Sequence, residues 1–103
     1  MPKTFIVLVR PQALEQFAGH IEFLARVSVK SAQGLEVLFN KAIDILEENA
    51  QLIPFWYEDY RKLTFSRYAL IYQVFENTVV VRKILDMRTE EFNDLYLKAE
   101  DAE

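Results

Sequence analysis

The sequence predicts an α+β domain made of a strand, a pair of helices, three antiparallel strands and a final helix, in that order. Apolar residues recur at helical spacing through residues 12–48, and the spacing changes to the alternation typical of strands after Pro54. A helix with one apolar face needs a surface to cover, and a sheet supplies that surface. The length of 103 residues, 51% of them hydrophobic, predicts a single domain over 1–103.

The N-terminal half is expected to hold one strand and two helices. Residues 4–9 are rich in β-branched side chains and too few for a helix core, so they predict a strand buried on both faces. Pro11 ends this strand and suits the first turn of a helix over residues 12–26. A second helix is expected over residues 30–48, and the short break between the two predicts an antiparallel hairpin.

The C-terminal half alternates in the manner of a sheet. Residues 55–65, 67–75 and 79–87 are predicted to form a three-stranded antiparallel meander. Glu76 and Asn77 supply the tight turn between the last two strands. Strict alternation would place the odd-numbered residues of the last strand on one face and the even-numbered residues on the other.

The chain ends in an acidic segment over residues 89–103. Thr89 is a good N-cap for a short helix that reaches about residue 99. The segment carries a net charge of −5, whereas residues 1–88 carry +1 and the whole chain −4. No strongly basic stripe, the usual footprint of a nucleic-acid binder, is therefore apparent. The final helix either packs against the sheet or covers the face where a site would lie.

Several classes of site and location are excluded by the composition. The sequence has no cysteine, so disulfides and thiolate metal sites are ruled out. It has neither a zinc-binding spacing nor a Gly-rich phosphate loop, and we expect no metal and no cofactor. The apolar run near the N-terminus is too short to span a membrane, so we expect a cytoplasmic protein that makes no membrane contact.

Two groups of side chains have alternative interpretations. His20 is the only histidine and lies off the apolar stripe of the first predicted helix, so we expect it at the surface rather than in catalysis. Phe55, Trp56, Tyr57 and Tyr60 cluster around the start of a predicted strand. Aromatic side chains there either fill a core or a partner interface, or they stack on the bases of single-stranded RNA.

Three short motifs occur in an order found in one known family. Tyr68-Ala69-Leu70-Ile71-Tyr72-Gln73-Val74 is a strand bracketed by tyrosines, and residues 76–81 form an acidic turn that leads into a valine strand. Arg61-Lys62-Leu63 precedes them as a basic strand, and Arg88 ends the last strand. Over about residues 4–96, the chain thereby resembles the RelE/ParE superfamily of bacterial toxins.

This resemblance implies a toxin of a type II toxin–antitoxin system, with a cognate antitoxin as its protein partner. One branch of the family enters the ribosome and cuts mRNA, which would make the chain a ribosome-dependent endoribonuclease. The other branch inhibits DNA gyrase. A gyrase inhibitor, or a degenerate member that only binds a partner, would be non-enzymatic. A homodimer is an alternative assembly.

The resemblance also nominates site residues. Basic side chains of the mRNA-cutting members hold phosphate and stabilise charge as a 2′-hydroxyl attacks. The positions here that match this role are Arg61, Lys62, Arg88 and Tyr96. Further candidates for binding RNA or a protein partner are Arg67, Arg82 and Lys83. The alternative interpretation of the cations is an ordinary solvated sheet face.

Two positions depart from the family pattern. Ala69 stands where the family usually has an arginine, and Asp86 stands where ParE-like members often have a histidine. An alanine cannot hold phosphate and an aspartate repels it, so both positions favour a non-enzymatic member. The tyrosine-bracketed strand instead favours the branch that cuts mRNA.

Overall fold

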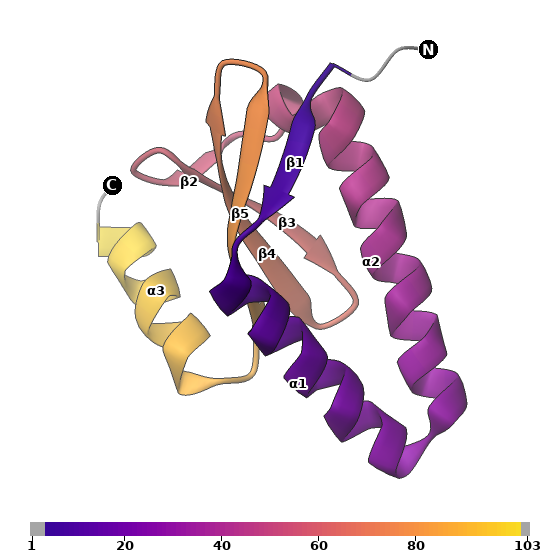
Figure 1. Cartoon of the computed structure of the whole chain (residues 1–103). Coiled ribbons are helices and arrows are strands. Elements are labelled where there is room, and N and C mark those ends of the chain that lie inside the picture. The colour runs from indigo at the N-terminus through magenta and orange to yellow at the C-terminus, as the bar shows by residue number, and fades with distance from the viewer. Residues whose placement is uncertain (1–3, 102–103) are drawn as a thin grey trace.

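The computed structural model of the chain describes residues 4–101 and confirms the predicted α+β order of elements (Figure 1). The strands form one mixed sheet in the order β1-β5-β4-β3-β2, in which β1 runs parallel to β5 and all other neighbours are antiparallel. The elements are β1 (Ile6–Val9), α1 (Pro11–Val27), α2 (Val29–Asn49), the 3-10 turn η1 (Ala50–Leu52), β2 (Phe55–Tyr57), β3 (Tyr60–Phe65), β4 (Tyr68–Phe75), β5 (Thr78–Asp86) and α3 (Glu90–Asp101).

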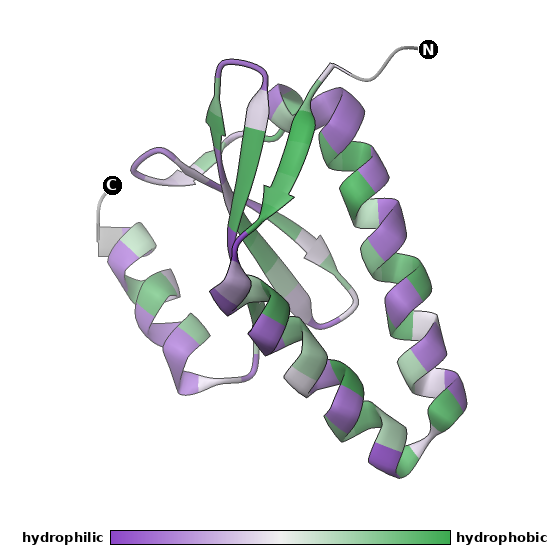
Figure 2. Cartoon of the chain, in the orientation of Figure 1, coloured by the Kyte–Doolittle hydropathy of each residue, from purple (hydrophilic) through white to green (hydrophobic). Residues whose placement is uncertain are grey.

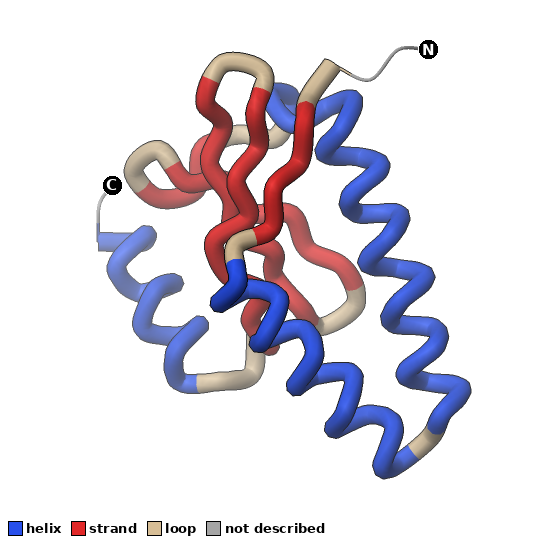
Figure 3. Tube along the Cα trace, viewed as in Figure 1, coloured by secondary structure: helices blue, strands red, loops and turns tan. Residues whose placement is uncertain are grey.

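Helices α1 and α2 form the predicted antiparallel hairpin, with Ser28 alone between them. The Ser28 amide donates to the Leu24 carbonyl oxygen at 2.7 Å, and its Oγ accepts from the Ser31 amide at 3.2 Å, so this one residue ends α1 and caps α2. The rings of Phe17 and Phe39 stack between the two helices at a centroid distance of 4.3 Å. The hairpin covers one face of the sheet (Figure 3).

The main core lies between this hairpin and the sheet. Alternate residues of β4, among them Leu70 and Tyr72, are fully buried there against Leu46 of α2. The prediction that the first strand is buried on both faces is wrong. Strand β1 lies at the edge of the sheet, and only its odd-numbered side chains reach the core, whereas Ile6 and Leu8 are exposed although β1 is apolar throughout (Figure 2).

The run over residues 55–65, predicted as one strand, is in fact a hairpin of two. Glu58 adopts a left-handed backbone conformation with φ of 51°, and the chain turns there between β2 and β3. The meander therefore has four strands instead of three. The predicted turn at Glu76 and Asn77 is confirmed, and Glu76 again has positive φ, at 55°.

A β-bulge in β5 breaks the expected strict alternation. Ile71 of β4 pairs with Lys83, but the next residue, Tyr72, pairs with Val81, so Arg82 is an extra residue on β5. Val81 and Ile84 both face the main core, and the two residues between them face the other side of the sheet. The expectation of one parity per face holds only up to the bulge.

Beyond Val81, strand β5 no longer has β1 beside it, and side chains of α1 complete its hydrogen bonding. The Ile84 amide donates to Gln16 Oε1 at 2.8 Å, and the Ile84 carbonyl oxygen lies 2.8 Å from His20 Nε2. The His20 ring also packs on Tyr68, with 4.7 Å between centroids. The surface position expected for His20 is therefore wrong, since the ring is half-buried against the sheet.

Helix α3 packs on the other face, which the hairpin leaves open. Thr89 Oγ1 accepts from the Phe92 amide at 3.4 Å, in line with its predicted role as N-cap. Phe92 is buried and stacks on Trp56 of β2, with centroids 5.9 Å apart and an interplanar angle of 8°. Among residues 4–101, none of the helices combines the length and the apolar character that crossing a bilayer would require.

Candidate functional site

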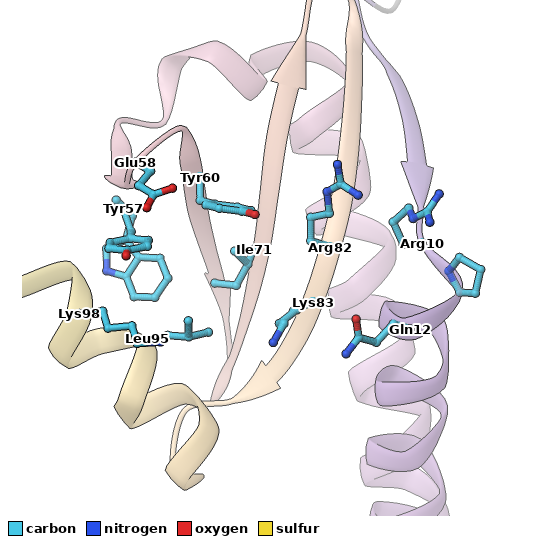
Figure 4. A pocket seen from close by; sticks show the side chains of 12 residues that line it. Arg10, Gln12, Tyr57, Glu58, Tyr60, Ile71, Arg82, Lys83, Leu95 and Lys98 are labelled. Atoms are coloured by element: carbon cyan, nitrogen blue, oxygen red, sulfur yellow. The ribbon is translucent and has the colours of Figure 1, made fainter. Parts of the chain in front are cut away.

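A pocket of about 630 Å³ opens on the face of the sheet opposite the α1–α2 hairpin (Figure 4). Its floor includes Ile71 of β4. One wall is α3, which contributes Leu95, and another is the junction of β1 and α1, which contributes Pro11 and Gln12. The β2–β3 hairpin closes the side near α3. We call this concavity the open-face pocket.

Four cationic side chains line the open-face pocket: Arg10, Arg82, Lys83 and Lys98. The first turn of α1 lies beside them and adds the partial positive charge of a helix N-terminus. The carboxylate among the lining residues belongs to Glu58. The lining thus carries more positive than negative charge in a chain whose net charge is −4, although Glu91 of α3 forms an ion pair with Lys83. Such a site favours an anionic ligand.

Aromatic side chains form the side of the pocket near α3. Trp56, Tyr57 and Tyr60 all line it, and they come from the β2–β3 hairpin. The negative charge of Glu58 raises the pKa of the neighbouring Tyr57 phenol above its ordinary value. Aromatic faces beside cations can accept the bases and the phosphates of a nucleic acid together.

Two of the predicted RNA- or partner-binding residues, Arg82 and Lys83, lie in the pocket. Two of the predicted catalytic residues lie next to the pocket: Lys62 on β3 and Tyr96 on α3. The Lys62 ammonium sits 4.8 Å from the Trp56 ring centroid and 5.9 Å from that of Tyr96. The structure therefore brings Lys62 and Tyr96 together, with the cation covered by aromatic rings.

Arg61, a third predicted catalytic residue, lies on the opposite face of the sheet. Its Nη1 donates to the carbonyl oxygens of Ile53 at 2.5 Å and Gln51 at 3.2 Å, and its guanidinium lies 4.0 Å from the Phe55 ring centroid. These contacts fasten the segment between η1 and β2 to the sheet. In the described structure, the Arg61 side chain is thus engaged away from the open-face pocket.

Arg88 and Arg67 lie at the far end of the sheet from the pocket. Arg88 forms a two-bond ion pair with Asp86, with nitrogen–oxygen distances of 2.7 and 3.1 Å. This hydrogen bonding lowers the pKa of Asp86 below its ordinary value. Arg67 is exposed in the turn between β3 and β4. The structure does not gather Arg61, Arg88 and Lys62 into one constellation.

Three charged residues of the pocket were missed by the sequence interpretation: Arg10, Lys98 and Glu58. Arg10 follows the last residue of β1, and the parallel pairing of β1 with β5 brings it beside Arg82. The parallel pairing of the first and last strands is the signal that could have revealed Arg10. A strand that leads directly into a helix places its last residues beside the helix N-terminus. Glu58 could have been found only by recognising that the 55–65 run turns there.

Comparison with the known protein families found no match for this chain, and comparison with curated protein sequences found none either. Among residues 4–101, no three histidine, aspartate or glutamate side chains lie close enough together to hold a metal ion. The chain is thus an α+β protein with two N-terminal helices on one face of a mixed five-stranded sheet. The other face carries a pocket lined by cationic and aromatic side chains.

Proposed function

We propose that this chain is a toxin of the RelE/ParE type, the growth-inhibiting half of a type II toxin–antitoxin pair, and that it cuts mRNA on the ribosome. The observation that carries the proposal is the open-face pocket, in which cations and aromatic rings surround one concavity. Single-stranded RNA presents phosphates and bases in alternation, which suits this lining. The order of the elements and the tyrosine-bracketed β4 support the family assignment.

The chemistry that fits such a pocket is an attack of the ribose 2′-oxygen on the adjacent phosphorus. The bond between phosphorus and the 5′-oxygen breaks, which leaves a 2′,3′-cyclic phosphate on one product and a 5′-hydroxyl on the other. We assign Glu58 to accept the 2′-hydroxyl proton, because its carboxylate lines the pocket, and water to protonate the 5′-oxygen. Arg82, Lys83 and their neighbours stabilise the negative charge that develops on the phosphate.

A cognate antitoxin is the partner that this proposal requires. An antitoxin that occupied the open-face pocket would place acidic side chains against its cations and exclude RNA. The expected result of co-expression with the antitoxin is a stable complex and normal growth. Size-exclusion chromatography of the chain alone would also show whether it forms a homodimer.

The experiment that tests the proposal is expression of the chain alone in bacteria, with protein synthesis and DNA synthesis labelled separately. We expect growth to stop, protein synthesis to fall first, and mRNA to carry new 5′ ends at ribosome-bound positions. Glu58→Gln should abolish the cuts, and Arg82→Ala combined with Lys83→Ala should abolish them as well. Lys41→Ala, on the exposed side of α2, is the matched control and should leave the arrest unchanged.

The residues nominated by the family resemblance are tested in the same assay. Arg61→Ala and Arg88→Ala are expected to lose the arrest if the family's catalytic set operates here. Because Arg61 fastens the segment before β2, circular dichroism must show that this variant is folded. Loss of arrest in folded Arg88→Ala with the arrest kept in Glu58→Gln would move the catalytic role away from the pocket.

A second candidate function is a non-enzymatic member that inhibits DNA gyrase or only binds a partner. Two observations favour it. Arg88, a predicted catalytic cation, is already engaged in an ion pair with Asp86. Ala69, which stands where the family usually has an arginine, is buried on the open face. A fall in DNA synthesis before protein synthesis would support gyrase inhibition. Normal growth with abundant folded protein would support partner binding alone.

A further inference from the structure

The bulge in β5 turns two consecutive cations toward the open-face pocket. In a regular strand, neighbours point to opposite faces, so Arg82 and Lys83 would be separated by the sheet. Because Arg82 is the extra residue between the pairs Tyr72–Val81 and Ile71–Lys83, both side chains line the same pocket. Bulges re-aim side chains in this way beside functional sites.

The Arg82 guanidinium is held by a buried glutamine. Gln73 of β4 is only 8% exposed, and its Oε1 accepts from Arg82 Nε at 2.8 Å. Its Nε2 donates to both carboxylate oxygens of Asp59, each at 3.0 Å. A carboxylate only accepts and a guanidinium only donates, so the Gln73 amide is satisfied in one orientation alone. The three side chains form a fixed bracket that joins the β2–β3 turn to β4 and β5.

This bracket leaves the outer part of Arg82 available. The bond to Gln73 uses Nε, and the two terminal nitrogens bond to none of the residues that the structure describes. A guanidinium fixed at Nε presents those nitrogens as a planar pair of donors, the geometry that matches two oxygens of a phosphate. Beside it, the Lys83 ammonium is in an exposed ion pair with Glu91 at 3.1 Å, a contact weak enough to exchange for a ligand.

We propose that Arg82 and Lys83 form a fork that binds a backbone phosphate of single-stranded RNA, and that Gln73 is the positioning residue that orients it. This inference rests on the proposed function, in which RNA occupies the pocket. Trp56 and Tyr60 line the same concavity and provide ring faces for the bases next to that phosphate. A carboxylate-rich peptide would make no comparable use of those rings, so RNA is the ligand that the site fits best.

The test is binding of a fluorescein-labelled single-stranded RNA of ten nucleotides to the purified chain, followed by fluorescence anisotropy at several salt concentrations. Arg82→Ala should weaken binding about tenfold, the usual effect of losing a charge-assisted contact. Gln73→Leu keeps every charge and should weaken binding to a similar extent. The double variant should bind no more weakly than Arg82→Ala, because Gln73 acts through Arg82. Lys41→Ala is the charge control and should bind like the wild type.

Exchanging the amide of Gln73 and the carboxylate of Asp59 tests whether Gln73 orients Arg82 or only fills space. Gln73→Glu alone places two carboxylates against each other and should weaken RNA binding. In the double variant with Asp59→Asn, the new carboxylate at position 73 accepts from Arg82, and the new amide at position 59 donates to that carboxylate. RNA binding should therefore recover to within about twofold of the wild type. Circular dichroism of each variant establishes that the fold is kept.

Three outcomes would overturn the fork. These are equal affinity in wild type and Arg82→Ala, additive losses for Arg82→Ala and Gln73→Leu, or displacement of the RNA by poly-glutamate as readily as by inorganic phosphate. Failure of the proposed function is recognised separately. RNA binding with the expected coupling, in a chain that never arrests growth, would retain the fork and remove the toxin activity.

Discussion

The two faces of the sheet are built from the same strands but differ in what they bury. The face under α1 and α2 carries the main hydrophobic core, and its largest fully buried side chains include Tyr72, Leu46 and Leu70. The face toward α3 has a small core around Ile71 and Phe92, and cations, aromatic rings and the buried Gln73 share the remaining surface. Except at the bulge in β5, alternation along the strands thus separates the side chains of the main core from those of the open face.

The largest expected effect comes from a cavity on the helix-covered face. Leu46→Ala should lower the free energy of unfolding by about 2–5 kcal/mol, because Leu46 is fully buried against the sheet. Leu97→Ala, on an exposed position of α3, should change it by less than about 0.5 kcal/mol. Urea denaturation measures both. Equal losses would contradict the view that the helix-covered face supplies most of the stability.

The next effect concerns the α1 side chains that replace a strand beside β5. Gln16→Leu removes the acceptor for the Ile84 amide and should cost about 1–3 kcal/mol of unfolding free energy. Gln16→Glu retains an acceptor and should cost clearly less. Urea denaturation of the two variants, with hydrogen exchange of the Ile84 amide, measures the difference. If both are equally stable, the hydrogen bond contributes nothing beyond packing.

A smaller effect is expected at the Tyr72 hydroxyl, which donates to the Ala50 carbonyl oxygen at 2.8 Å in the core. Tyr72→Phe should cost about 1 kcal/mol at neutral pH. Burial raises the pKa of Tyr72 from 10.0 to about 12, so the unfolded chain loses this proton first. Stability should therefore fall as pH rises from 10 to 12.

That alkaline fall should be shallower in Tyr72→Phe, and denaturation at a series of pH values measures it. Part of the slope should persist, because burial also raises the pKa of Tyr68. An unchanged slope in Tyr72→Phe would mean that Tyr72 ionises as easily in the folded as in the unfolded chain.

The smallest effect on stability is expected at the ion pair of Arg88 with Asp86, in which the Arg88 side chain is exposed and the Asp86 carboxylate is largely covered. Hydrogen bonding to Arg88 lowers the pKa of Asp86, so the pair stabilises the fold above the ordinary value of 3.8 and is lost as pH falls below it. Arg88→Ala should raise the Asp86 pKa, which carboxyl NMR titration measures. At neutral pH, the variant should lose less stability than any of the destabilising changes above, because the Arg88 side chain is 60% exposed. An unmoved pKa would show that the pair does not persist in solution.

The sequence was sufficient for the order and bounds of the helices, because their apolar stripes and caps are local signals. The helix predicted over 12–26 runs from Pro11 to Val27, and Thr89 bonds the Phe92 amide as an N-cap does. Local signals were insufficient where tertiary pairing decides. The exposure of Ile6 and Leu8 follows from the position of β1 at the sheet edge, which no pattern within residues 4–9 encodes.

The candidate site was predictable only in part. Arg82 and Lys83 were predicted to bind RNA or a partner, and both line the pocket, but strict alternation would have placed them on opposite faces. The bulge that unites them depends on pairing with β4. His20 also illustrates this limit, since its contact with Ile84 joins residues 64 positions apart in the sequence.

The parallel pairing of β1 with β5 has a consequence for how the chain acquires its fold during synthesis. Ile6 pairs with Thr78, so β1 leaves the ribosome well before β5 and must wait for it before it can join the sheet. At synthesis rates of about 5–20 residues per second, that wait is roughly 4–14 seconds. The α1–α2 hairpin can make its local contacts meanwhile, before it packs on the sheet. An apolar strand is thus exposed in the nascent chain until the meander is complete.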